Sequence, residues 1–298
     1  MKKQLLVTIA VSFAAIVLCA SFLQAQTTNT SRGFQALFSN TSGTYNTAMG
    51  YLALRSNTTG TSNSGFGAQT LTLNTTGGQN TATGRFALYS NTTGGNNTAS
   101  GAGALYFNST ARDNTATGVN ALYNNRTGNL NTAIGSAALY SNTTGYQNWG
   151  GGNSALFSNT TGYHNSAGGS SALSANTTGY RNSAHGSGAL GSNTTGHTNT
   201  ANGYQALFDN TSADFNTANG GSALRNNTTG YQNTAVGAAA LYGNTTGFEN
   251  TALGYQALFL GGTGYQNVAA GHRALFLNTT GADNTACGTE ALYSNSTG

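Results

Sequence analysis

Side chains that could support catalysis or metal binding are few and scattered in this sequence. The four histidines, His164, His185, His197 and His272, occupy four different positions of a 17-residue repeat that runs along the chain. Metal sites need ligands that converge on one point, and residues in different columns of a repeat do not stack or cluster. The six acidic residues are equally dispersed. We therefore expect no catalytic residue, no metal site, no cofactor and no small-molecule substrate, and we expect that the chain is not an enzyme.

One chemically competent pattern does recur, the sequon N-x-S/T that accepts N-linked glycans. It returns once per repeat in fifteen of sixteen copies and is missing only at Gly261. The same residues, as in Asn57-Thr58-Thr59-Gly60, are also favourable turn chemistry, so a glycan site and a structural turn both remain open. The candidate N-glycosylation residues are Asn40, Asn57, Asn74, Asn91, Asn108, Asn125, Asn142, Asn159, Asn176, Asn193, Asn210, Asn227, Asn244, Asn278 and Asn295.

The repeat itself is the dominant feature of the chain. The unit YQNTAVGAAALYGNTTG at Tyr231 to Gly247 recurs, without insertion or deletion, in sixteen copies from Thr27 to Gly298. A composition rich in Gly, Asn, Ser and Thr also suits disorder, but a disordered linker has no reason to keep one frame. Strict phasing is typical of a stacked solenoid. The sequence predicts an all-β, parallel β-solenoid of sixteen 17-residue coils over residues 27–298.

Within each copy, Asn, a small residue and Gly alternate, as at Asn46, Ala48 and Gly50. Alternate residues of a strand share one face, so these three columns are expected to point into a narrow interior. The Asn column is predicted to form a ladder along that interior. Its members are Asn46, Asn63, Asn80, Asn97, Asn114, Asn131, Asn148, Asn165, Asn182, Asn199, Asn216, Asn233, Asn250, Asn267 and Asn284.

A second apolar pattern follows, the pair Ala53-Leu54 and then a residue that is Phe or Tyr in eleven copies. We expect two short strands per coil, near Asn46 to Gly50 and Ala53 to Arg55. Because adjacent strand residues face opposite ways, Leu and Ala would lie on different faces, with Ala and the aromatic residue buried against another chain. This candidate assembly face comprises Phe38, Tyr89, Tyr106, Tyr123, Tyr140, Phe157, Phe208, Tyr242, Phe259, Phe276 and Tyr293.

The N-terminus predicts export. Lys2 and Lys3 precede an apolar run from Leu5 to Leu23, which is the pattern of a signal peptide over residues 1–26, with an uncleaved N-terminal anchor as the alternative. After removal of this segment, eight arginines face six acidic residues, and Cys287 is the one remaining thiol. Such sparse, mixed charge predicts no nucleic-acid partner.

The run N-T-A-x-G-x-x-A-L at Asn131 to Leu139 and Asn250 to Leu258 resembles the YadA-like head repeats of trimeric autotransporter adhesins. Similar repeats occur in fibrous proteins that carry endosialidase-type chaperone domains. The resemblance implies a left-handed β-roll, three chains side by side and a place on an extracellular surface. The present unit is longer by its Asn-Thr-Thr-Gly turn, and neither end shows an atypical capping repeat, which predicts axial stacking.

These observations favour a secreted, extracellular structural or adhesive fibre protein of the cell surface. It would self-associate side by side, as a trimer or filament, with end-to-end stacking and a glycan coat as further options. Its partners would be copies of itself, and glycans or a host or matrix surface. A tyrosine stripe at Tyr146, Tyr163, Tyr180 and Tyr231 suits sugars or a plain turn decoration. The alternatives are a ligand-binding adhesin head of a larger surface protein and, less favoured because Thr47 lacks a paired threonine, an ice-binding solenoid.

Overall fold

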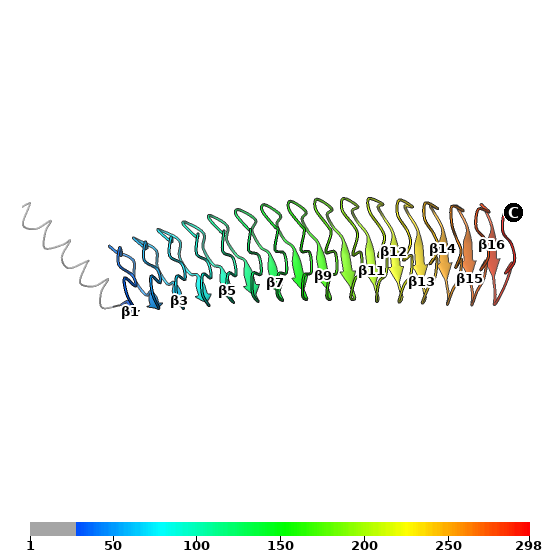
Figure 1. Ribbon diagram of the computed structural model, residues 1–298. Helices are drawn as coiled ribbons and strands as arrows, with labels where there is room; N and C mark the ends of the chain where they lie inside the picture. Colours follow the sequence, from blue (N-terminus) through cyan, green and yellow to red (C-terminus); the bar gives the residue numbers. More distant parts are fainter. Residues whose placement is uncertain (1–27) are drawn as a thin grey trace, which may run out of the picture.

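The computed structural model describes residues 28–298, which form one all-β solenoid whose coils follow one another along a rod (Figure 1). The signal-peptide prediction for residues 1–26 lies outside the described residues. No helix occurs in residues 28–298. Each coil has one strand of three residues: β1 (Thr30–Arg32), β2 (Thr47–Met49), β3 (Ser64–Phe66), β4 (Thr81–Thr83), β5 (Thr98–Ser100), β6 (Thr115–Thr117), β7 (Thr132–Ile134), β8 (Trp149–Gly151), β9 (Ser166–Gly168), β10 (Ser183–His185), β11 (Thr200–Asn202), β12 (Thr217–Asn219), β13 (Thr234–Val236), β14 (Thr251–Leu253), β15 (Val268–Ala270) and β16 (Thr285–Cys287).

The strands form a single parallel sheet in the order of the sequence, from β1 to β16. The register never slips: Thr47 pairs with Ser64, and Ala48 pairs with Gly65. Because no copy gains or loses a residue, each position of the repeat stacks on the same position of the next coil. The predicted parallel β-solenoid is confirmed.

The strand is held by its alternation. In β2, Ala48 is fully buried, whereas Thr47 and Met49 are half-buried on the outer side. β-branched threonine favours extended backbone, and alanine leaves room for the opposite wall of the narrow coil. The inward direction of Asn46 and Ala48 therefore agrees with the sequence pattern.

The second predicted strand, near Ala53 to Arg55, is wrong. This segment is a turn in which Leu52 and Leu54 have left-handed backbone, with φ of 56° and 52°. The Leu52 amide donates to the Phe34 carbonyl of the preceding coil at 3.0 Å, and the Leu54 amide donates to the Thr70 carbonyl of the following coil at 2.9 Å. Successive left-handed residues thus bond to opposite neighbours, which ties the coils together without an extended strand.

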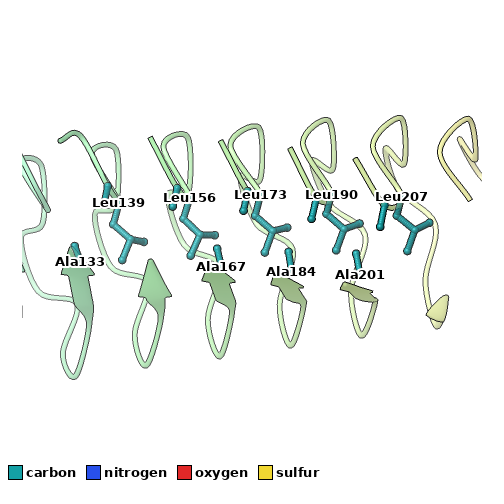
Figure 2. Close-up of a cluster of buried hydrophobic side chains, with 14 of the residues drawn as sticks. Ala133, Leu139, Leu156, Ala167, Leu173, Ala184, Leu190, Ala201 and Leu207 are labelled. Atoms are coloured by element: carbon teal, nitrogen blue, oxygen red, sulfur yellow. The ribbon is translucent and has the colours of Figure 1, made fainter. Parts of the chain in front are cut away.

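This backbone also overturns the prediction of two apolar faces. Ala53 and Leu54 are both fully buried in one core, because the rule that adjacent side chains point apart holds only for extended backbone. Figure 2 shows the leucines from Leu139 to Leu207 in one row, directed toward strand alanines such as Ala167. Left-handed backbone costs leucine roughly 1–2 kcal/mol, and full burial of its side chain offsets this by about 1.5–3 kcal/mol.

The sequence pattern predicts that Gly50 is glycine because it points into a narrow interior, but the structure gives a different reason. Its φ of 144° lies in the region that favours glycine, and a Cβ there would collide with the Gly67 carbonyl oxygen of the next coil. Gly50 itself is only half-buried. The column is therefore set by backbone geometry and close approach between coils, not by a narrow interior.

Candidate interaction surface along the aromatic columns

Two asparagine columns close the coils and connect each coil to its neighbours, except that Gly261 replaces the turn asparagine of the β14 coil. In the interior column, the backbone N–H of Asn63 donates to Asn46 Oδ1 at 3.0 Å, and the side-chain Nδ2 of Asn63 donates to the Gly77 carbonyl at 2.8 Å. The second bond joins the beginning of the coil to its end, fourteen residues later. The interior asparagines from Asn46 to Asn267 are buried, and Asn284 is half-buried.

The turn asparagines, which carry the sequons, form a second buried ladder. Asn159 Nδ2 donates to Asn142 Oδ1 at 2.8 Å and to the Gly162 carbonyl at 3.0 Å. The Gly162 carbonyl also accepts from Asn148 Nδ2 of the interior column at 2.8 Å, so both ladders converge on one oxygen. The turn asparagines are fully buried from Asn57 to Asn244 and at Asn278, and the two in the outermost coils, Asn40 and Asn295, are half-buried.

This geometry opposes the glycosylation hypothesis. An N-linked glycan replaces one hydrogen of Nδ2, and in Asn159 both hydrogens are committed within a side chain that has no exposed surface. Losing one bond would leave a buried acceptor without its donor, at a cost of about 1–3 kcal/mol. In the folded coil these asparagines form a structural ladder, which favours the turn interpretation, and their glycosylation stays a prediction.

The candidate assembly face lies on the outside of the coil, not on the alanine side. Its rings stack on one another in two runs, with centroids 5.0–5.2 Å apart and interplanar angles of 2–20°. The long aromatic ladder consists of Tyr89, Tyr106, Tyr123, Tyr140 and Phe157, and the short aromatic ladder consists of Tyr242, Phe259, Phe276 and Tyr293. Most of these rings are half-buried, because each covers the face of the next and leaves its edge outside. Phe38 stands apart and is 67% exposed.

Tyr106 is the centre of the densest ring cluster. It stacks between Tyr89 and Tyr123, and the edge of Phe107 meets it at 4.7 Å between centroids. Burial raises the pKa of the Tyr106 phenol above its ordinary value, and the neighbouring phenols of Tyr89 and Tyr123 raise this pKa further. The neutral phenol is thus the form that fits this ladder.

A second aromatic column occupies the first position of the repeat. Tyr146, Tyr163 and Tyr180 stack at 5.0 and 4.9 Å, and His197 continues the stack at 4.5 Å. The His197 ring in turn pairs with Asp214 at 3.1 Å. Tyr231 begins a separate run with Phe248 and Tyr265. The tyrosines of this stripe were predicted from the sequence, but the extension of their stacks by His197 and Phe248 was not. Both residues occupy the same position of the repeat as the tyrosines, and this shared position is the signal that could have identified them.

Residues suited to metal binding stay dispersed in the fold. Among residues 28–298, no group of three or more His, Cys, Asp or Glu side chains is placed to share a metal ion. Cys287 is exposed and is not part of a disulfide. In the same part of the chain, no helix has the length and apolar character needed to cross a membrane.

No known protein-family model matches this chain, and no curated protein matches it either. The resemblance to YadA-like head repeats therefore stays a prediction that rests on the repeat motif. The function of the chain must be inferred from the side chains that recur at each position of the repeat.

Proposed function

We propose that this protein is an extracellular structural fibre protein whose rods associate side by side through the aromatic ladders. The observation that carries the proposal is the long aromatic ladder, five rings in unbroken stacking on the outer surface of the rod. Four steps of about 5 Å make an apolar strip about 20 Å long, edged by phenol hydroxyls. Tyrosine is enriched at protein interfaces because one side chain offers a large apolar area and a polar tip.

The rod supports this role because every coil repeats the same inter-coil bonds. The asparagine ladders, the sheet and the leucine core all run along the axis, and each of them joins a coil to the next one. Such a linear stack holds a surface column in constant register over its length. Two rods that meet along their ladders would therefore gain the same contact at each coil, and small contacts would add up.

The test is the mass of the full chain in solution, measured by sedimentation velocity across a concentration series. The variant Y123S/Y140S removes two central rings, and the matched control T200S/T217S changes two residues of the sheet face. We expect association of the unmodified chain and of the control, and loss of association in the ring variant with unchanged circular dichroism. Monomers at every concentration, or equal association of all three proteins, would refute lateral association through the ladder. Electron microscopy of the same samples would count the chains and would test the axial-stacking prediction.

Ice binding is a second candidate, favoured by the outer face of three neighbouring strands. On β4, β5 and β6, both outward residues carry hydroxyls, whereas β2 has a methionine at the second position. Strands about 4.8 Å apart and alternate residues about 6.7 Å apart place these groups on a regular two-dimensional grid. The outward residues are Thr81, Thr83, Thr98, Ser100, Thr115 and Thr117. Thermal hysteresis that disappears in T98L and persists in Y123S would support this function, and absence of hysteresis would exclude it.

A further inference from the structure

The aromatic column is interrupted in the middle of the rod. After Phe157 in the β8 coil, the same position holds Ser174 in the β9 coil and Gly191 in the β10 coil, before Phe208 in the β11 coil. On the side of lower residue number, five coils in succession carry stacked rings. The interruption therefore exposes the last ring of the long ladder, and Phe157 is 38% exposed.

Two rings of the column, Tyr123 and Phe208, lean over the preceding coil. A Cβ built on Gly103 in the β5 coil would lie 3.3 Å from Cε2 of Tyr123 in the β6 coil. By the same offset, a ring at position 174 would cover Ser154. The structure instead has a recess of about 330 Å³ there, lined by Ser154, Phe157, Ser158, Ser174 and Ala175. The recess thus lies where one ring of the column is missing.

The other missing ring leaves no equivalent opening. The Phe208 ring lies against the β10 coil, where a Cβ on Gly191 would be 2.8 Å from Phe208 Cε2. The guanidinium of Arg225 stands over the Phe208 ring, 5.4 Å from its centroid. The Phe208 ring therefore covers the surface beside Gly191, and Arg225 covers the Phe208 ring. The surface beside Ser174 stays open.

The recess combines one apolar wall with a polar rim. The face of the Phe157 ring that Tyr140 does not cover forms the wall, and Ser154, Ser158 and Ser174 also line the recess. The hydroxyls of Ser154 and Ser174 donate to Asn153 Oδ1 and to the Gly191 carbonyl, both at 3.1 Å, so each oxygen keeps lone pairs that can accept. None of the five lining residues is charged, which selects a neutral ligand.

We propose that this recess binds one neutral pyranose ring of a glycan, stacked on Phe157 with its hydroxyls at the serine rim. A pyranose has a face of C–H groups and an edge of hydroxyls, which matches an aromatic wall beside acceptor oxygens. A phenylalanine or tyrosine side chain of a second copy would also stack on Phe157, but it brings at most one hydroxyl to the oxygens of the rim, whereas a pyranose brings several. The volume lies at the lower end of the range of about 300–1,000 Å³ for small-molecule sites, which suits a single sugar unit.

Such a site is weak when it acts alone. One stacked ring and a few solvent-exposed hydrogen bonds predict a dissociation constant of about 1–10 mM. Several rods held in one assembly would bind a polysaccharide with higher avidity. The inference is independent of lateral association, because it depends on the open face of Phe157 and not on the buried faces of the ladder.

Saturation-transfer NMR and titration of the full chain would test the site. The probes are methyl β-D-glucopyranoside, methyl β-D-galactopyranoside and N-acetylglucosamine, each at about 10 mM. The variant S174Y fills the recess with the ring found at this position in other coils, and F157A removes the wall. The matched control F276A removes a ring of the short ladder far along the rod.

We expect binding of at least one sugar, weakened by about tenfold or more in S174Y and F157A and unchanged in F276A. Because S174Y introduces a side chain that other coils, such as that of Tyr140, already accommodate at this position, loss of binding in this variant would not reflect unfolding. Absence of binding by all three sugars, or equal binding by S174Y, would overturn the proposal. Binding of p-cresol in place of the sugars would do the same and would assign the recess to an aromatic side chain.

Discussion

The β14 coil has a gap in the turn asparagine ladder, where Gly261 replaces asparagine. Asn244 Oδ1 is buried there without a hydrogen-bond partner. The neighbouring turn also differs, because Gly262 has a φ of 49° and Thr263, not residue 262, donates to the Thr279 carbonyl. The double variant G261N/G262T would give this coil the turn residues of its neighbours. We predict that it stabilises the rod locally.

The magnitude follows from the bonds that other coils make. Asparagine at position 261 would donate to Asn244 Oδ1 and to the Gly264 carbonyl, as Asn159 donates to its two acceptors. It would also accept from Asn278 Nδ2, and the amide of residue 262 would regain a bond to the next coil. Four bonds at about 1 kcal/mol each, less the ordering of a larger side chain, give a gain of about 2–4 kcal/mol.

Because a solenoid opens locally, amide hydrogen exchange is the suitable assay. Peptides that cover residues 241–281 should exchange about 30 to 1,000 times more slowly in G261N/G262T. The reciprocal variant N159G/T160G introduces the same gap in the β8 coil and should accelerate exchange over residues 139–179 by a similar factor. Unchanged exchange in both regions would refute the view that the turn ladder stabilises the coils.

Three further predictions concern single positions. Gly220 has a φ of 147° and a Cβ there would meet the Gly237 carbonyl, whereas a Cβ on Gly221 meets nothing within 4 Å; urea titration should show that G220A is destabilised by about 1–3 kcal/mol and that G221A changes by less than about 1 kcal/mol. Burial raises the pKa of the Tyr106 phenol, so its stabilising contribution is complete below the unfolded pKa of about 10 and is lost as pH rises through the folded value. Between pH 9 and pH 11, roughly the range around that pKa, the melting temperature of Y106F should therefore fall less than that of the unmodified chain. Intact-mass measurement of the native chain should show no glycan on Asn159, whose amide hydrogens are both bonded; a hexose-spaced mass series that disappears in N159Q would contradict this.

The sequence alone determined the stack. A 17-residue period without insertion or deletion forces each column onto itself, so the parallel order, the constant register and the inward Asn46 and Ala48 could all be predicted. The break in the aromatic column at Ser174 was also visible in the sequence as a change of residue type. The break forms a recess because the rings tilt over the preceding coil, and the sequence of the column does not reveal this tilt.

Only the tertiary structure decided the conformation of the segment at Ala53 and Leu54. Leucine has no intrinsic preference for left-handed backbone, so local propensity favours the extended strand that was predicted. The left-handed form prevails because it buries the leucine beside alanine and directs its amide to the next coil. The same kind of contact positions the turn asparagines: Asn57 Nδ2 donates to Asn40 Oδ1 of the neighbouring coil, an acceptor seventeen residues away in the sequence. Stacking energy between coils, which the local sequence does not reveal, selected both conformations.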